Sequence, residues 1–141
     1  MKTTLIKNGT LITAADTVKA DLLIEGEQIR LIGASLIAPP DALVIDATGK
    51  YLLPGGVDPH CHFDLPMFGT VSSDDHYTGH KAAAFGGTTT VIDFVPQDRP
   101  TLEESVAAWR AKADPKAAID FSFHMNLSRL DEQIAAEIPR L

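Results

Sequence analysis

Leu53-Pro54-Gly55-Gly56-Val57-Asp58-Pro59-His60-Cys61-His62, residues 53–62, mark the point at which the sequence changes character. On an extended strand, side chains two residues apart point to the same side, so His60 and His62 project together while Cys61 faces away. Neutral imidazoles bind zinc at ~2.0–2.1 Å per nitrogen, and two on one face fit a single ion. An isolated His-x-His tripeptide is weak evidence; a preceding strand and Pro-Gly-Gly turn make a metal site the stronger interpretation.

Downstream of this segment, helical and strand patterns alternate. We predict helices at 73–85, 101–113 and 130–138, and strands at 88–95 and 118–125. Ser73 is expected to cap the first helix and Gly86-Gly87 to end it, whereas Thr101 and Glu104 have the spacing of a capping box. Alternating strands and helices predict a parallel sheet with crossover helices.

The repeat length of this alternation points to a particular architecture. Each unit is close to the ~30 residues of one unit in a (β/α)₈ barrel of ~250 residues. Only three units are present, and a three-stranded parallel sheet would leave an unpaired strand edge on each side. We therefore expect the polypeptide to continue beyond Leu141. A complete three-stranded α/β domain is the alternative.

Upstream of residue 53 the sequence favours short strands. Asn8-Gly9 and Glu25-Gly26-Glu27 are expected to form hairpin turns, and residues 43–46 form another β-rich run. We therefore predict an α/β protein: a small N-terminal β-sandwich lobe at 1–52, followed at 53–141 by the first three βα units of an incomplete TIM-like barrel.

Composition excludes several classes of protein. The net charge of −7 disfavours nucleic acid and anionic membranes as partners, and no apolar run approaches the ~18 residues of a membrane span. The single cysteine, Cys61, cannot form an internal disulfide. These features predict a cytoplasmic protein.

Residues 55–94 resemble the amidohydrolase superfamily and, within it, the dihydropyrimidinase/hydantoinase family. The resemblance runs through residues 54–63, Pro66-Met67-Phe68-Gly69-Thr70, Ser73-Asp74-Asp75, Gly86-Gly87-Thr88-Thr89-Thr90 and Ile92-Asp93-Phe94, and Asp120–Met125 is similar to the family's third strand. The resemblance implies a metal-dependent hydrolase barrel that binds two divalent metal ions, and both ions are expected to be Zn²⁺. His60 and His62 would bind the first ion. The carboxylated lysine that bridges both ions would lie beyond residue 141, so neither Lys112 nor Lys116 is that lysine.

The same resemblance implies a reaction and a substrate class. The ions lower the pKa of a bound water, which attacks a ring amide and opens a dihydropyrimidine or 5-substituted hydantoin to an N-carbamoyl amino acid. Dihydroorotases of the superfamily usually carry an arginine two residues after the second histidine; Asp64 stands there, which disfavours a carboxylate-bearing ring. Leu65, Met67 and Phe68 are expected either to line the pocket for the ring substituent or only to pack the loop against the barrel.

Other polar residues receive weaker interpretations. His76 and His80 are expected to be an ordinary solvent-facing pair outside the barrel, and His124 either to approach the barrel mouth or to pack in the core. Asp58 and Asp93 are expected to orient the metal-binding histidines or to satisfy loop backbone groups.

Three functional hypotheses remain from the sequence. The first is cyclic-amide hydrolysis by a homo-oligomer, a tetramer by family resemblance, with the 141-residue chain inactive alone. The second is a non-catalytic dihydropyrimidinase-related assembly or signalling protein that has lost metal ligands. The third is another amidohydrolase, such as an allantoinase or a D-aminoacylase.

Overall fold

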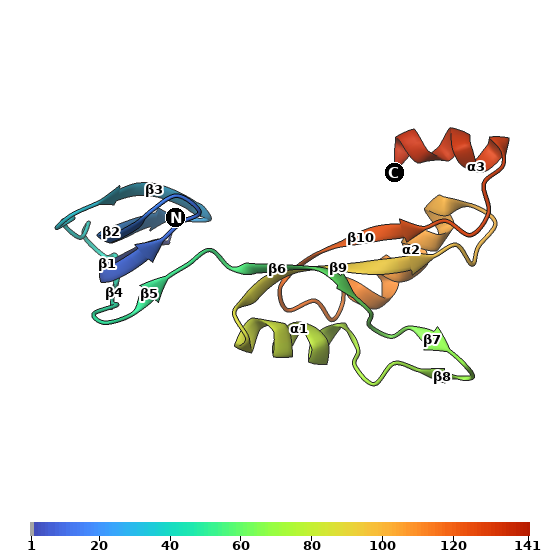
Figure 1. Cartoon of the computed structure of the whole chain (residues 1–141), viewed down its shortest axis with the longest axis horizontal. Helices are drawn as coiled ribbons and strands as arrows, with labels where there is room; N and C mark the ends of the chain where they lie inside the picture. Colours follow the sequence, from blue (N-terminus) through green and yellow to red (C-terminus); the bar gives the residue numbers. More distant parts are fainter. Residues whose placement is uncertain (1) are drawn as a thin grey trace. The chain divides into compact units, whose positions relative to one another are not determined.

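The computed structural model describes residues 2–141, which separate into two compact units, Met1–Pro54 and Gly55–Leu141 (Figure 1). The division lies after Pro54, close to the change of pattern at residue 53. No helix among the described residues is long and apolar enough to cross a membrane.

Unit 1 is built on one five-stranded sheet. Its strands are β1 (Thr3–Ile12), β2 (Thr17–Glu25), β3 (Gln28–Gly33), β4 (Leu43–Asp46) and β5 (Tyr51–Leu52). The strand order is β3-β2-β1-β4, and β5 also pairs with β1. The β1–β2 and β2–β3 pairs are antiparallel. Strands β4 and β5 run parallel to β1. The predicted hairpin at Glu25-Gly26-Glu27 is confirmed as the β2–β3 turn. Among residues 2–54 there is one sheet, so the sandwich remains a prediction.

The predicted hairpin at Asn8-Gly9 is wrong. β1 continues through this pair with a register shift between Ile6 and Gly9, and Asn8 takes a positive φ of 64°. Asn8 can adopt this conformation because its backbone N–H donates to the buried Asp21 carboxylate at 2.8 Å, and its side chain donates to Asp46 at 2.9 Å. The pair therefore makes a β-bulge within a strand instead of a turn between two strands.

Unit 2 begins with a parallel sheet. Its strands are β6 (Gly56–Cys61), β9 (Thr88–Pro96) and β10 (Asp120–Asn126), in the order β10-β9-β6, and both pairs are parallel as the sequence predicts. The helices α1 (His76–Phe85) and α2 (Leu102–Ala113) connect successive strands, and α3 (Glu132–Glu137) and the 3₁₀ turn η1 (Ile138–Arg140) follow (Figure 1). A short hairpin, β7 (Pro66–Met67) and β8 (Thr70–Val71), precedes α1.

The two faces of this sheet differ in burial. Alternate residues of the central strand, Val91, Asp93 and Val95, are buried on the face that packs against α1 and α2. Leu102, Trp109 and Ala113 of α2 and Phe63 are also buried. On the opposite face Val57 is 60% exposed and Phe94 is partly exposed. The helices thus cover one face of the three strands, and the other is open within residues 55–141.

The observed helix caps show how well the helix ends can be predicted from local sequence. The capping box of α2 is confirmed, because Thr101 accepts from the Glu104 N–H and the Glu104 side chain accepts from the Thr101 N–H. The cap of α1 is Asp75, not Ser73, and Thr78 completes its capping box. The helix therefore begins at His76 instead of residue 73.

Candidate metal centre

His60 and His62 occupy the carboxyl-terminal end of β6. The strand ends at Cys61, whose register partner on β9 is Asp93, a residue of the helix-covered face. Cys61 therefore faces the helices, and its two histidine neighbours face the open side. Their ring centroids are 5.3 Å apart with an interplanar angle of 89°. The shared orientation expected from the alternation of a strand is present in the structure.

Two neighbouring strands add aromatic groups to the same site. The Phe94 ring lies 4.5 Å from the His60 ring, 5.4 Å from the His62 ring and 5.1 Å from the His124 ring, measured between centroids. Because the three strands are parallel, their carboxyl-terminal ends meet at one edge. His124 is exposed at this edge, so it is not the packed core histidine that was one expectation.

The donor set at this edge is incomplete within residues 2–141. No group of three or more His, Cys, Asp or Glu side chains in this range could hold a metal ion. Two exposed imidazoles on one face nevertheless fit part of a zinc donor set, since zinc sites take their ligands from nitrogen, sulfur and carboxylate groups. The observed geometry is compatible with a shared site to which other residues contribute.

Asp58 and Cys61 have structural roles here. Asp58 Oδ1 accepts the backbone N–H of His60 at 3.0 Å, so the carboxylate fixes the strand backbone, one of the two expected roles. Burial, followed by the charges of Asp93 and Asp58, raises the pKa of the Cys61 thiol to about 12. The thiol is therefore protonated at neutral pH and a poor nucleophile or ligand.

Asp93 lies directly behind His62. Its side chain is 1% exposed, Oδ1 accepts the Phe94 N–H at 2.6 Å, and the same oxygen is 3.9 Å from His62 Nδ1. Burial raises the pKa of the Asp93 carboxyl, against the backbone hydrogen bonds that lower it. A carboxylate in this position can orient a metal-binding histidine.

His76 and His80 contradict the expectation of a solvent-facing pair. Both are fully buried, at 0% exposure, where α1 meets the sheet. Their rings contact Phe63 and Phe121, with centroid distances from 5.2 to 6.2 Å. Burial is the first cause of the lowered pKa of both imidazoles, and it brings the pKa of His76 to about 4. They are neutral residues of the core, and their burial was not predicted from the sequence.

The β7–β8 hairpin carries the loop residues expected at the substrate pocket. Its tip is Phe68-Gly69, both with positive φ (50° and 78°), and the Phe68 side chain is 99% exposed. Met67 is 46% exposed, while Leu65 is partly buried at the base. Phe68 therefore does not pack the loop against the residues described in unit 2.

Two lysines at the end of α2 fix the base of this loop. Lys116 Nζ lies 3.1 Å from Asp64 Oδ2 and 3.2 Å from Asp75 Oδ2, and so joins the two ends of segment 64–75. Lys112 Nζ donates to the Asp64 carbonyl at 3.0 Å and sits 3.8 Å above the Trp109 ring centroid. Neither contact could be read from sequence spacing, because 48 and 52 residues separate the partners.

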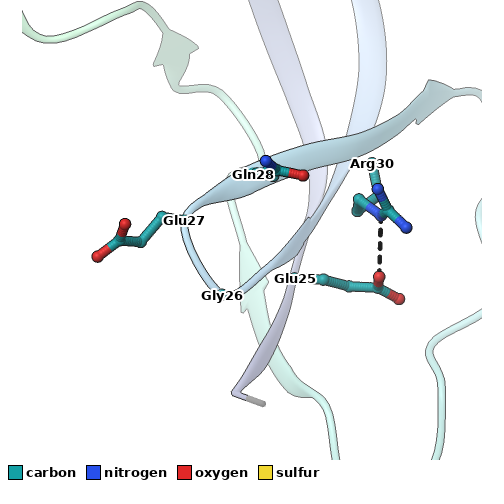
Figure 2. A pocket seen from close by; sticks show the side chains of 5 residues that line it. All are labelled: Glu25, Gly26, Glu27, Gln28 and Arg30. Atoms are coloured by element: carbon teal, nitrogen blue, oxygen red, sulfur yellow. Dashed lines mark hydrogen bonds and ion pairs between the residues drawn. The ribbon is translucent and has the colours of Figure 1, made fainter.

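A hollow in unit 1 offers no comparable chemistry. It lies beside the β2–β3 turn and is lined by Glu25, Gly26, Glu27, Gln28 and Arg30 (Figure 2). Glu25 and Arg30 form an exposed ion pair at 3.0 Å across it. Exposed pairs of this kind contribute little to stability, and the other charged group that lines the hollow, the Glu27 carboxylate, is exposed as well.

Comparison with known proteins gives consistent results. No protein-family model matches the chain. The chain is 48% identical to a D-hydantoinase of Geobacillus stearothermophilus over 140 residues, which are 99% of this chain and 30% of the relative. It is 43% identical to a dihydropyrimidinase of Dictyostelium discoideum over 137 residues, 96% of this chain and 27% of the relative.

Solved structures give the same result. A dihydropyrimidinase from Brevibacillus agri superimposes with a TM-score of 0.92 and 50% identity, over 96% of this chain and 30% of that one. An L-hydantoinase from Arthrobacter aurescens gives a TM-score of 0.72 at 25% identity, over 87% and 27% of the two chains. The chain thus spans about 30% of the length of the relatives it matches most fully. The resemblance inferred from residues 55–94 is confirmed: nearly the whole chain is similar to D-hydantoinases and dihydropyrimidinases, as an amino-terminal fragment of a member of that family would be.

Proposed function

We propose that this chain supplies the amino-terminal part of a metal-dependent hydrolase that opens cyclic amides. The observation that carries the proposal is the pair His60 and His62, which share the open face at the carboxyl-terminal edge of a parallel sheet. In α/β barrels, catalytic groups lie at this edge. Similarity to D-hydantoinases and dihydropyrimidinases over nearly the whole chain supports the same conclusion.

We infer the architecture of the whole protein from the incomplete parts of this one. The open face and the two-helix cover of unit 2 suit the first three βα units of a (β/α)₈ barrel, and the exposed apolar side chains of unit 1 suit one layer of a sandwich. A cytoplasmic homo-oligomer, a tetramer by family resemblance, is the expected assembly, and light scattering of the full-length gene product measures its mass.

His60 and His62 would hold one of two divalent ions, with Zn²⁺ the expected metal. A carboxylated lysine beyond residue 141 would complete the bridge between the ions. When bound, the ions would supply Lewis acidity and an activated water at neutral pH. Behind the pair, Asp58 holds the His60 backbone and Asp93 faces His62 Nδ1.

The substrate class is a dihydropyrimidine or a 5-substituted hydantoin. Addition of water across one ring amide C–N bond gives an N-carbamoyl amino acid. Leu65, Met67 and Phe68 would contact the ring substituent, because an exposed hairpin tip held at a fixed base is available to cover a ligand. An apolar or aromatic substituent suits these side chains.

The proposal is tested on the full-length gene product. Metal content is measured by mass spectrometry, and hydrolysis is measured with dihydrouracil and 5-phenylhydantoin. About two zinc ions per chain with ring opening of either compound supports the proposal, since a binuclear site requires both ions. Metal-free protein without turnover contradicts it and favours a non-catalytic relative. Hydrolysis of allantoin, measured in the same way, but of neither of the other two compounds favours an allantoinase.

A further inference from the structure

Three buried polar atoms around Asp93 lack a conventional hydrogen-bond partner. They are His76 Nε2, Asp93 Oδ2 and Trp109 Nε1. The first two face each other at 3.7 Å, and the Trp109 indole is close enough to lower the pKa of the Asp93 carboxyl. Because buried polar groups are almost always paired, the carboxylate and these two donors form one polar cluster between α1, α2 and β9.

The hydrogen bonds behind this cluster determine which histidine nitrogens carry protons. The Ala118 N–H donates to His80 Nδ1 at 3.3 Å, so in the neutral ring the proton of His80 is on Nε2. That nitrogen lies 3.4 Å from His76 Nδ1, which must accept. The proton of His76 is then on Nε2, the atom that faces Asp93 Oδ2.

The donors converge on the Asp93 carboxylate, which also faces the candidate metal ligand His62. Asp93 Oδ1 accepts the Phe94 N–H and lies 3.9 Å from His62 Nδ1. A metal-binding histidine commonly donates its second N–H to a carboxylate, which fixes its tautomer and ring orientation. Asp93 is the carboxylate closest to His62 on the buried side, and its own position depends on His76.

We propose that His80 and His76 form a buried, directional hydrogen-bond chain that holds the Asp93 carboxylate and, through it, orients His62 for metal binding. Both histidines are positioning residues, because neither reaches the open face where metal and substrate would bind. The inference rests on the proposed function. It also explains why imidazoles occupy a pocket lined by Phe63 and Phe121, where phenyl rings would pack without polar atoms to satisfy.

The test compares three variants of the full-length gene product with the parent protein. His76→Phe keeps the aromatic packing and removes the donor, whereas His76→Gln keeps an N–H at the reach of Nε2. His60→Ala removes a proposed ligand and serves as the reference. Zinc affinity is measured by competition with a chelator, and the visible absorption spectrum of the Co²⁺-substituted protein reports the ligand geometry.

We expect His76→Phe to weaken zinc binding by about tenfold, at the lower end of the effect of losing a group that supports a ligand. His76→Gln should remain within about threefold of the parent and restore its Co²⁺ spectrum, a rescue that a packing role alone would not give. If His76→Phe does not fold, His80→Phe decides, because it removes the preceding donor; we expect a loss of about threefold or more.

The outcomes separate this inference from the proposed function. If His60→Ala loses zinc while His76→Phe or, failing it, His80→Phe keeps the parent affinity and Co²⁺ spectrum, the chain does not orient His62 and the inference is overturned. If His76→Gln is as impaired as His76→Phe, the hydrogen bond is not the cause, and the inference also fails. If the parent binds no zinc, the proposed function and the inference fall together.

Discussion

Two pairs of histidines lie on opposite sides of the same sheet with nearly the same ring geometry. The centroids of His60 and His62 are 5.3 Å apart at 89°, and those of His76 and His80 are 5.3 Å apart at 87°. The pairs differ in their surroundings: the first is exposed at a strand end, and the second is completely buried against phenylalanines.

The difference shows that spacing and ring geometry do not identify a metal site. A cation bound by the buried pair would lose its hydration in an apolar pocket. Three of the four ring nitrogens there already bond to each other or to the backbone. The exposed pair has an open side on which further ligands can converge. Burial and hydrogen bonding therefore favour the proposal that the exposed pair binds metal and that the buried pair supports it.

The largest effect is expected from the exposed pair. His62→Ala should lower kcat/KM of the full-length product for its cyclic amide about a thousandfold, because ~4 kcal/mol of transition-state stabilisation by metal is lost. Lys81→Ala, at an exposed position of α1 on the helix-covered side of the sheet, is the control and should stay within about threefold. Steady-state kinetics distinguish these outcomes, and a His62→Ala enzyme within tenfold of the parent would contradict the assignment.

The buried pair should instead control stability at acidic pH. The pKa of His76 falls from 6.5 in the unfolded chain to about 4 in the fold, so the unfolded state binds more protons between these values. The contribution of His76 to the free energy of unfolding is therefore fully present above pH 6.5. It is lost as the pH drops towards 4, by roughly 3 kcal/mol in total. Thermal unfolding of the full-length product across this range measures the effect.

His76→Phe is the comparison for this pH dependence. Since phenylalanine does not titrate, the Tm of this variant should fall less than that of the parent between pH 6.5 and 4. Parallel Tm curves for the two proteins would show that His76 is not a buried neutral imidazole.

A smaller effect is expected where α1 approaches the strand end. A Cβ at Gly79 would collide with the Phe63 ring, which follows His62 directly. Gly79→Ala should destabilise by about 1–2 kcal/mol, because overpacking outweighs the gain of ~1 kcal/mol in helix propensity. Chemical denaturation measures the change, with exposed Ala84→Ser on the same helix as the control; a stabilised Gly79→Ala protein would indicate that Phe63 moves freely.

The smallest expected effect concerns the loop that follows the exposed pair. Lys116→Met removes the cation between Asp64 and Asp75 and should change global stability by less than about 1 kcal/mol, since these groups are partly exposed. We expect KM for 5-phenylhydantoin to rise a few-fold with kcat nearly unchanged, and Lys116→Arg to restore it. An unchanged KM would indicate that the loop base does not influence substrate binding.

Much of this fold could be predicted from local sequence. The β-branched run from Thr88 and the Thr101–Glu104 capping box describe contacts between near neighbours, and both are present as expected. The same holds for the shared face of His60 and His62, which follows from the alternation of side chains along a strand. Local physics suffices where the partners are close in sequence.

Two of the incorrect expectations depend on distant partners. Asn8 makes a bulge instead of a turn because Asp21 and Asp46 accept its N–H groups, and no local pattern indicates those partners. The burial of His76 and His80 did have a sequence signal: with Gly79 they form one helical face, and a glycine there indicates close approach. The sequence interpretation placed the pair in solvent because the helix lies outside the barrel, and it did not use the signal from Gly79.

We propose that the exposed histidine pair binds metal and that the buried pair does not. A crystal structure of the full-length gene product, with anomalous data collected at the zinc absorption edge, tests it directly. We expect an anomalous peak about 2.0–2.1 Å from a ring nitrogen of His60 and of His62. An anomalous peak at His76 and His80, or no peak near His60 and His62 in zinc-loaded protein, would contradict it.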